Sequence, residues 1–136
     1  MPNRAAHRFE VRVYYEDTDM AGIVYHANYL RYIERARSDW VRQMGIDQLA
    51  MKDAGQVFAV RRIEAEYRRP ARFDDLLVVE TWVETLTPAR MVMGQIVRRE
   101  DTEIFGARVT VAVIGPGGKP ARLPAELRAL PVAPPP

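Results

Sequence analysis

The sequence predicts an α+β fold in which a five-stranded antiparallel sheet wraps around one long helix. One amphipathic helix follows a first strand, and four alternating segments joined by short turns follow the helix. Short turns favour antiparallel neighbours. Because the chain has 136 residues, of which 48% are apolar and 28% charged, we expect a single soluble domain spanning residues 1–136.

The first strand is expected at Glu10–Tyr15. Val11, Val13 and Tyr15 alternate there with polar or charged neighbours, which is the period of a strand with one buried face. A run of acidic residues then breaks the alternation and ends at Gly22, where a glycine allows backbone angles that other residues avoid. The chain is therefore expected to turn between this strand and the helix.

The long helix is expected to begin at about His26 or Asn28. Apolar residues recur from there to Met44 at intervals of three and four, which predicts one buried stripe. We expect Asn28 to cap the start of the helix and Gly45 to follow its end. A short second helix is expected at Gln48–Ala54.

Four further strands are expected after the helices, at Val57–Arg68, Leu76–Leu86, Arg90–Arg99 and Ile104–Ile114. Arg61 interrupts the alternation of the first. The outward-facing positions of the others include the bulky residues Val78, Trp82, Val92 and Ile96. This face is more apolar than a solvated sheet requires, so we expect it to contact another subunit. Residues 131–136 form a proline-rich tail that is expected to be flexible.

Composition excludes several classes of function. The net charge of +2 gives no basis for binding nucleic acid. The absence of cysteine excludes thiolate catalysis and disulfides, and with two histidines we expect neither a metal site nor a cofactor. No run approaches the roughly 18 apolar residues that a membrane span needs. We therefore expect a cytoplasmic protein, with peripheral contact at the inner membrane left open.

The loop between the first strand and the long helix carries an uncommon motif. It reads Tyr-Tyr-Glu-Asp-Thr-Asp from Tyr14 and continues as Ala-Gly-Ile-Val-Tyr-His-Ala-Asn-Tyr from Ala21. This run resembles the signature of the hotdog-fold thioesterases of the 4-hydroxybenzoyl-coenzyme A thioesterase family. Within that family it is most similar to the Tol-Pal-associated bacterial acyl-CoA thioesterases. The resemblance extends to the order and lengths of the strands and implies the hotdog fold.

The resemblance also implies the site residues. The family places its essential aspartate three residues before the glycine of the loop, and the matching residue is Asp19. Relatives with aliphatic substrates add a tyrosine four residues before the aspartate and a histidine seven after it, which match Tyr15 and His26. Relatives that act on the aryl substrate lack this histidine. The resemblance therefore implies an aliphatic acyl-CoA thioesterase, with Asp19 as nucleophile or as general base.

This chemistry is physically reasonable. A carboxylate can attack a carbonyl or take a proton from water. Amide groups at the start of the long helix, near His26 and Ala27, can stabilise the oxyanion. Glu16 and Asp17 are expected to have structural roles. Solvated strand edges account for the arginines more readily than phosphate binding, so no coenzyme A contact is assigned among Arg61, Arg62, Arg68, Arg69, Arg72 and Arg90.

Two other functions remain open from the sequence. One is a hotdog hydratase or dehydratase that acts on acyl thioesters. The other is a non-catalytic partner of acyl carrier protein or of phospholipid synthesis. The resemblance implies an assembly of two or four identical subunits, and we expect a homotetramer rather than a homodimer. The thiol carrier is either coenzyme A or acyl carrier protein, and the length of the acyl chain is not predicted.

Overall fold

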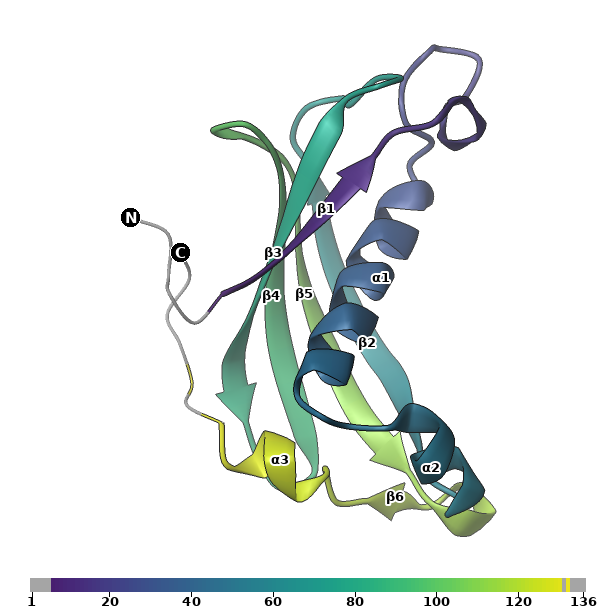
Figure 1. The fold of residues 1–136 in the computed structure, drawn as a ribbon, viewed down its shortest axis with the longest axis vertical. Helices are drawn as coiled ribbons and strands as arrows, with labels where there is room; N and C mark the ends of the chain where they lie inside the picture. The colour runs from purple at the N-terminus through teal and green to yellow at the C-terminus, as the bar shows by residue number, and fades with distance from the viewer. Residues whose placement is uncertain (1–5, 131, 133–136) are drawn as a thin grey trace.

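The computed structural model describes residues 6–130 and Val132. Five long strands, two regular helices and several short elements follow one another along the chain (Figure 1). They are β1 (His7–Arg12), the 3-10 turn η1 (Tyr15–Asp17), α1 (Asn28–Gln43), α2 (Gln48–Asp53), β2 (Val57–Tyr67), β3 (Leu76–Leu86), β4 (Arg90–Arg99), β5 (Thr102–Ile114), the turn η2 (Pro116–Gly118), β6 (Pro120–Ala121) and α3 (Ala125–Arg128). The predicted tail at 131–136 lies outside the described residues except for Val132.

The sheet has the predicted architecture with one addition. Its long strands are antiparallel and lie in the order β1-β3-β4-β5-β2, so β1 and β2 form the two edges. The two-residue strand β6 pairs with the end of β5, which makes six strands rather than the predicted five. Two residues are too few to show an alternating pattern, so this strand could not be predicted from the sequence. The other strands match their predicted bounds to within two residues, except β1.

β1 begins and ends earlier than predicted, and the predicted strand Glu10–Tyr15 is wrong in its second half. The chain leaves the sheet after Arg12, and residues Tyr15–Asp17 form a 3-10 turn. The buried carboxylate of Asp17 accepts a hydrogen bond from the backbone N–H of Tyr14, which holds this turn closed. The alternating pattern in the sequence therefore extends past the end of the strand, into a segment where side-chain hydrogen bonds favour a turn.

Helix α1 lies across the concave face of the sheet (Figure 1). Its apolar stripe, with Ile33 and Ala36 fully buried, packs on the inward-facing residues of the strands and forms the main core. The helix ends as predicted, because Gly45 has a φ of 80° and donates its N–H to the carbonyl of Arg42. The start differs from the prediction. Ala27 occupies the capping position, and Asn28 is the first helical residue.

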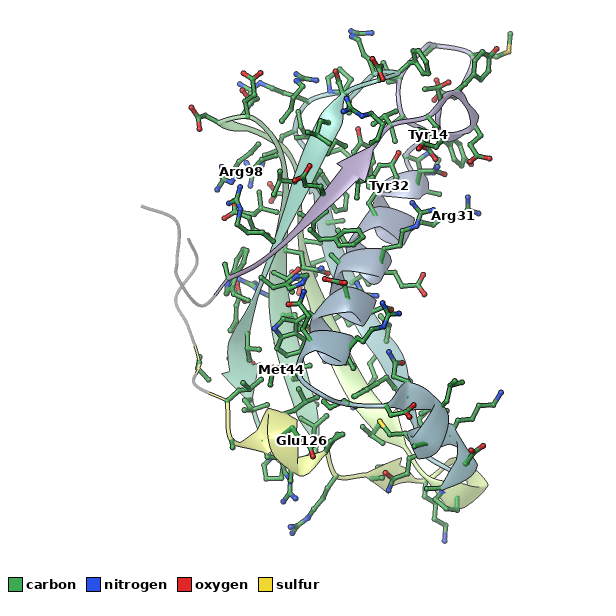
Figure 2. The ribbon with its side chains drawn as sticks, viewed as in Figure 1. Tyr14, Arg31, Tyr32, Met44, Arg98 and Glu126 are labelled. Atoms are coloured by element: carbon green, nitrogen blue, oxygen red, sulfur yellow. The ribbon has the colours of Figure 1, made fainter. Side chains whose placement is uncertain are left out.

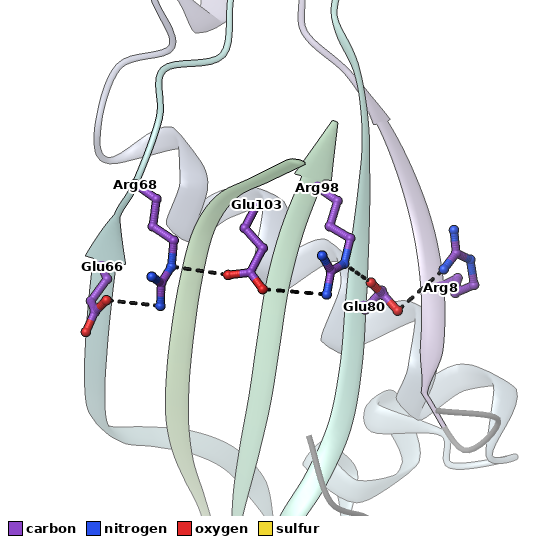
Figure 3. Close-up of polar contacts among 6 residues, drawn as sticks. All are labelled: Arg8, Glu66, Arg68, Glu80, Arg98 and Glu103. Atoms are coloured by element: carbon purple, nitrogen blue, oxygen red, sulfur yellow. Dashed lines mark hydrogen bonds and ion pairs between the residues drawn. The ribbon is translucent and has the colours of Figure 1, made fainter. Parts of the chain in front are cut away.

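The outer face of the sheet carries charges as well as apolar residues. A row of alternating charges crosses all five long strands or their ends, in the order Arg8, Glu80, Arg98, Glu103, Arg68 and Glu66 (Figure 3). Glu80 is nearly fully buried within this row. Beside it, Trp82 packs flat on Gly94, where an added Cβ would lie 2.3 Å from the indole ring. We call the six charged residues Arg8, Glu80, Arg98, Glu103, Arg68 and Glu66 the ionic row.

Candidate functional site

The loop that joins β1 to α1 is a narrow hairpin. The carbonyl of Asp17 accepts a hydrogen bond from the N–H of Tyr25 at 2.8 Å, and the N–H of Asp19 donates to the carbonyl of Ile23 at 2.9 Å. The tip of the hairpin is a turn in which the N–H of Gly22 donates to the carbonyl of Asp19 at 2.9 Å. Gly22 has a φ of 78°, which explains the glycine at this position.

This turn fixes the side chain of Asp19. Its Oδ1 accepts a hydrogen bond of 2.9 Å from the N–H of Ala21, two residues later. Such a contact between an aspartate and its own turn restrains the side chain without help from the rest of the protein. The carboxylate of Asp19 is therefore held in place while the residue stays exposed to solvent. Both features suit a group that must meet a substrate.

Asp17 has the opposite environment. Its carboxylate is buried and accepts hydrogen bonds of 2.8 Å from the N–H of Tyr14 and 2.8 Å from the side-chain amide of Asn28. The hydroxyl of Tyr32 lies near this carboxylate without forming a hydrogen bond of normal geometry. Burial of the hydroxyl is the main cause that raises the pKa of Tyr32, and the nearby carboxylate of Asp17 raises it further. Asp17 therefore connects the start of the loop to the first two turns of α1. Figure 2 labels Tyr14 in the loop and Tyr32 on α1.

A second loop, which precedes β3, supports the hairpin. The N–H of Val24 donates to the carbonyl of Ala71 at 2.8 Å, and the N–H of Ala71 donates to the hydroxyl of Tyr29 at 3.1 Å. Burial raises the pKa of Tyr29, while its bond to Ala71 opposes that shift. The ring of Tyr29 stacks on Phe105 with centroids 5.1 Å apart. Aromatic residues thus hold the hairpin that carries Asp19 against the sheet.

Asp19 and His26 line the same pocket at the start of α1. Its volume is about 380 Å³, and its other lining residues are Ile23, Val24, Tyr29, Tyr67, Arg68, Arg69 and Pro70. The hydroxyl of Tyr67 donates a hydrogen bond of 2.8 Å to the carbonyl of His26, which fixes the backbone just before the helix. The pocket combines one carboxylate, one imidazole and the N-terminal end of a helix. It can therefore bind and polarise a carbonyl group.

The structure brings together two of the three predicted site residues. Tyr15 belongs to η1, is 82% exposed to solvent, and does not line the pocket of Asp19 and His26. Two tyrosines that the sequence did not single out, Tyr29 and Tyr67, do line it. Tyr67 is the last residue of β2 and lies 41 residues after His26 in the chain, so only the folded chain reveals their proximity.

Two observations bear on other kinds of site. Among residues 6–130, no group of three or more histidine, aspartate or glutamate side chains is arranged to hold a metal ion. Over the same part of the chain, no helix has both the length and the apolar composition that crossing a membrane requires.

Comparisons with known proteins agree with this geometry. The family model of the thioesterase superfamily matches residues 21–105. The chain is 40% identical over 127 residues to a protein of Escherichia coli named acyl-CoA thioester hydrolase YbgC, which covers 92% of this chain and 95% of that one. A Haemophilus influenzae protein named acyl-CoA thioesterase YbgC is 40% identical over 89% of this chain and 90% of its own length.

Solved structures give the same result. The crystal structure of a probable thioesterase from Bartonella henselae superposes with a TM-score of 0.84 at 39% identity, covering 88% of this chain and all of that one. A 1,4-dihydroxy-2-naphthoyl-CoA thioesterase from Synechocystis has a TM-score of 0.83 at 22% identity, covering 89% and 91%, and supports the fold alone. The predicted hotdog fold is therefore confirmed, and the chain belongs to the thioesterase superfamily.

Proposed function

We propose that this protein hydrolyses acyl-CoA thioesters to a free acid and coenzyme A. The observation that carries the proposal is the pocket at the start of α1, where Asp19 and His26 meet. Relatives at 40% identity over nine tenths of the chain are named as acyl-CoA thioester hydrolases, which supports the same substrate class. The histidine at His26, which the related enzymes with aliphatic substrates share, favours an aliphatic acyl group over an aryl one.

In the proposed reaction, Asp19 is the catalytic carboxylate. As a base it takes a proton from water, and the resulting hydroxide attacks the thioester carbonyl. As a nucleophile it forms an acyl anhydride, which water then hydrolyses. In either route the carbonyl oxygen becomes an oxyanion near the amides of His26 and Ala27, and the C–S bond breaks as the thiolate leaves and takes up a proton.

His26 and Tyr15 are proposed as assisting residues. The imidazole of His26 lies in the same pocket as Asp19, with its ring centroid 4.5 Å from that of Tyr25. This position suits a group that orients water or polarises the carbonyl. Tyr15 supports the hairpin through its backbone, because its carbonyl accepts hydrogen bonds from both the N–H and the hydroxyl of Thr18.

We propose that the active form is an assembly of identical subunits, built first on β2. This strand is an edge of the sheet, and Val57, Val60, Ile63 and Tyr67 on it are between 38% and 51% exposed. An edge strand with free backbone groups and apolar side chains is a surface that proteins normally cover. Antiparallel pairing of β2 with a second copy would cover it and would extend the sheet.

A tetramer is proposed as the second level of assembly, through the outer faces of two sheets. The ionic row alternates in sign and ends with opposite charges at Arg8 and Glu66. A two-fold axis through the middle of the row would therefore set every cation opposite an anion of the other copy. Mass measurement in solution tests both levels. Ile63→Lys on β2 should give monomers, and Ile96→Asp on the outer face should give dimers.

The proposed location is the cytoplasm, with transient contact to the inner membrane. Met20 and Phe73 are exposed apolar side chains, and backbone pairing of Ile23 with Arg72 joins the two loops that carry them. A pair of exposed apolar side chains suits brief contact with lipid. Flotation with liposomes tests this contact. Binding that persists in the double variant Met20→Ser and Phe73→Ser would contradict it.

The function itself is tested with a panel of acyl-CoA and acyl carrier protein thioesters from short to long chains. We expect release of free thiol, faster with aliphatic acyl groups than with benzoyl groups, and the two arms of the panel identify the carrier. Loss of conjugated absorbance from an enoyl thioester without thiol release would instead indicate a hydratase. Tight binding of the thioesters without any turnover would indicate a non-catalytic partner of acyl carrier protein.

A further inference from the structure

A second pocket lies between α1 and the sheet, away from Asp19. Its volume is about 150 Å³, similar to a cavity that holds one benzene molecule. The strands contribute an apolar wall that includes Phe58, Met91 and Met93, whereas α1 contributes Glu34, Arg37 and Ser38. A pocket of this size accepts a segment of about six carbon atoms. Its arginine is an unusual component for a site that binds only hydrocarbon.

Arg37 is held in this pocket by a chain of hydrogen bonds. Its Nη1 donates to Oε1 of Gln95 at 3.0 Å. The amide nitrogen of Gln95 donates to the carbonyl of Ile33 at 3.0 Å and to the hydroxyl of Thr81 at 2.9 Å. Both hydrogens of that amide are therefore used, so its oxygen must face Arg37. The guanidinium has a fixed position, and this fixed position is a precondition for selective binding.

The charge of Arg37 is incompletely matched. Burial lowers its pKa, and Glu34 only partly opposes the shift. Within the described residues no carboxylate lies within 4.0 Å of the guanidinium, although many other arginines of the protein have such partners. A guanidinium offers five N–H donors. The contact with Gln95 uses one of them, and in this half-buried side chain an acceptor on a bound ligand would engage another.

The nearby Glu34 decides which acceptor fits best. Its carboxylate lines the same pocket and already balances part of the positive charge. A ligand carboxylate would be attracted by Arg37 and repelled by Glu34, whereas a hydroxyl or keto oxygen would gain the hydrogen bond without the repulsion. Neutral oxygen is therefore the better match.

The proposed dimer brings this pocket to the thioester. Antiparallel pairing of β2 with a second copy, with the two-fold axis near the middle of the strand, would set the half of β2 that carries Phe58 beside the half of the other copy that ends at Tyr67. Phe58 belongs to the second pocket, and Tyr67, beside Glu66, belongs to the pocket of Asp19. An acyl group whose carbonyl meets Asp19 of one subunit could therefore extend into the second pocket of its neighbour.

We propose that Arg37 selects acyl groups that carry a neutral oxygen, a hydroxyl or a keto group, toward the far end of the chain. The thioesterase activity and the β2 dimer described above are the basis of this inference. It makes Arg37 a specificity-determining residue of the acyl pocket, supplied by the neighbouring subunit. Plain chains of equal length bind in the same place but offer no acceptor to the guanidinium, which keeps only its bond to Gln95.

The test compares kcat/KM for octanoyl-CoA, 8-hydroxyoctanoyl-CoA, 7-oxooctanoyl-CoA and 7-carboxyheptanoyl-CoA. The full-length protein should prefer the hydroxyl and keto substrates over octanoyl-CoA by about tenfold, the effect of one hydrogen bond to a charged group. Arg37→Met should remove this preference, while Arg42→Met, an exposed arginine of the same helix, should leave it intact. If Arg37→Met does not fold, Arg37→Gln, which keeps a donor for Gln95, replaces it with the same expectation.

Binding measurements separate this inference from the thioesterase proposal. With Asp19→Asn as background, calorimetry should show about tenfold tighter binding of 8-hydroxyoctanoyl-CoA than of octanoyl-CoA, and adding Arg37→Met should abolish the difference. Equal preferences with and without Arg37 would overturn the inference. Strongest preference for the carboxylate would overturn the neutral-oxygen assignment. Failure of the wild-type protein to hydrolyse any substrate, with the binding difference intact, would contradict the thioesterase proposal alone.

Discussion

Replacing Asp17 by asparagine should destabilise the protein through one identifiable contact. The buried carboxylate accepts from the N–H of Tyr14 and from the side-chain amide of Asn28, each at 2.8 Å. Asparagine at this position keeps the shape and can still accept one of these bonds. Its own NH₂ group then faces the NH₂ group of Asn28, so neither of these two donors has an acceptor.

The expected cost follows from the kind of bond that is lost. A hydrogen bond to a charged group contributes about 1.5–3 kcal/mol, and a buried donor left without a partner costs a similar amount. We therefore expect Asp17→Asn to lower the free energy of unfolding by about 2 kcal/mol. Typical domains have only about 5–15 kcal/mol, so the loss is easily measured. Glu16→Gln, an exposed neighbour, should change stability by no more than about 0.5 kcal/mol.

The exchange of the two partners gives a sharper test. In the double variant Asp17→Asn and Asn28→Asp, the asparagine at 17 accepts from Tyr14 and donates to the new aspartate, which also lies favourably at the start of a helix. Urea unfolding should show that the double variant recovers most of the stability that Asp17→Asn loses. Equal or greater instability of the double variant would refute the assigned hydrogen-bond pair.

Three further predictions concern the sheet and α1. Gly94→Ala should cost about 2 kcal/mol and change tryptophan fluorescence, because its Cβ would overlap the ring of Trp82; unchanged stability would contradict that packing. Glu80→Gln should cost about 3 kcal/mol in urea unfolding, since it leaves Arg98 without its buried partner, and adding Arg98→Met should restore part of the loss. The raised pKa of Tyr32 means that the folded state holds this proton more tightly than the unfolded state, whose pKa is near 10.0. Stability should therefore be constant below about pH 10 and fall above it by about 1.4 kcal/mol per pH unit for this group, and urea midpoints of Tyr32→Phe should fall less steeply.

Elements with a long regular pattern could be predicted from the sequence. The apolar stripe of α1 gave its bounds closely, and the strands after it alternate over ten or more residues. Short elements could not be predicted in this way. Residues 120–121 are too few to show a period, and Tyr15 continued an alternation that the hydrogen bonds of Asp17 interrupt.

Some residues of the candidate site could likewise be predicted from the sequence, and others could not. The motif, through its family resemblance, pointed to Asp19 and His26, and the fold sets both in one pocket. Tyr67 could not be found from the sequence, since its contact with the carbonyl of His26 depends on how β2 meets the loop in three dimensions. The positions of Arg37 and Gln95 likewise depend on the register between α1 and β4.

We propose that Asp19, and not its buried neighbour Asp17, is the carboxylate that acts on the thioester. The most direct measurement is the rate of thiol release by Asp19→Asn and by Asp17→Asn, with the fraction folded determined under the same conditions. We expect Asp19→Asn to remain as stable as the wild type within about 0.5 kcal/mol while losing at least about a hundredfold in kcat. Asp17→Asn should lose stability and keep most of its turnover per folded molecule. Near-normal turnover by Asp19→Asn would show that Asp19 is not the catalytic carboxylate.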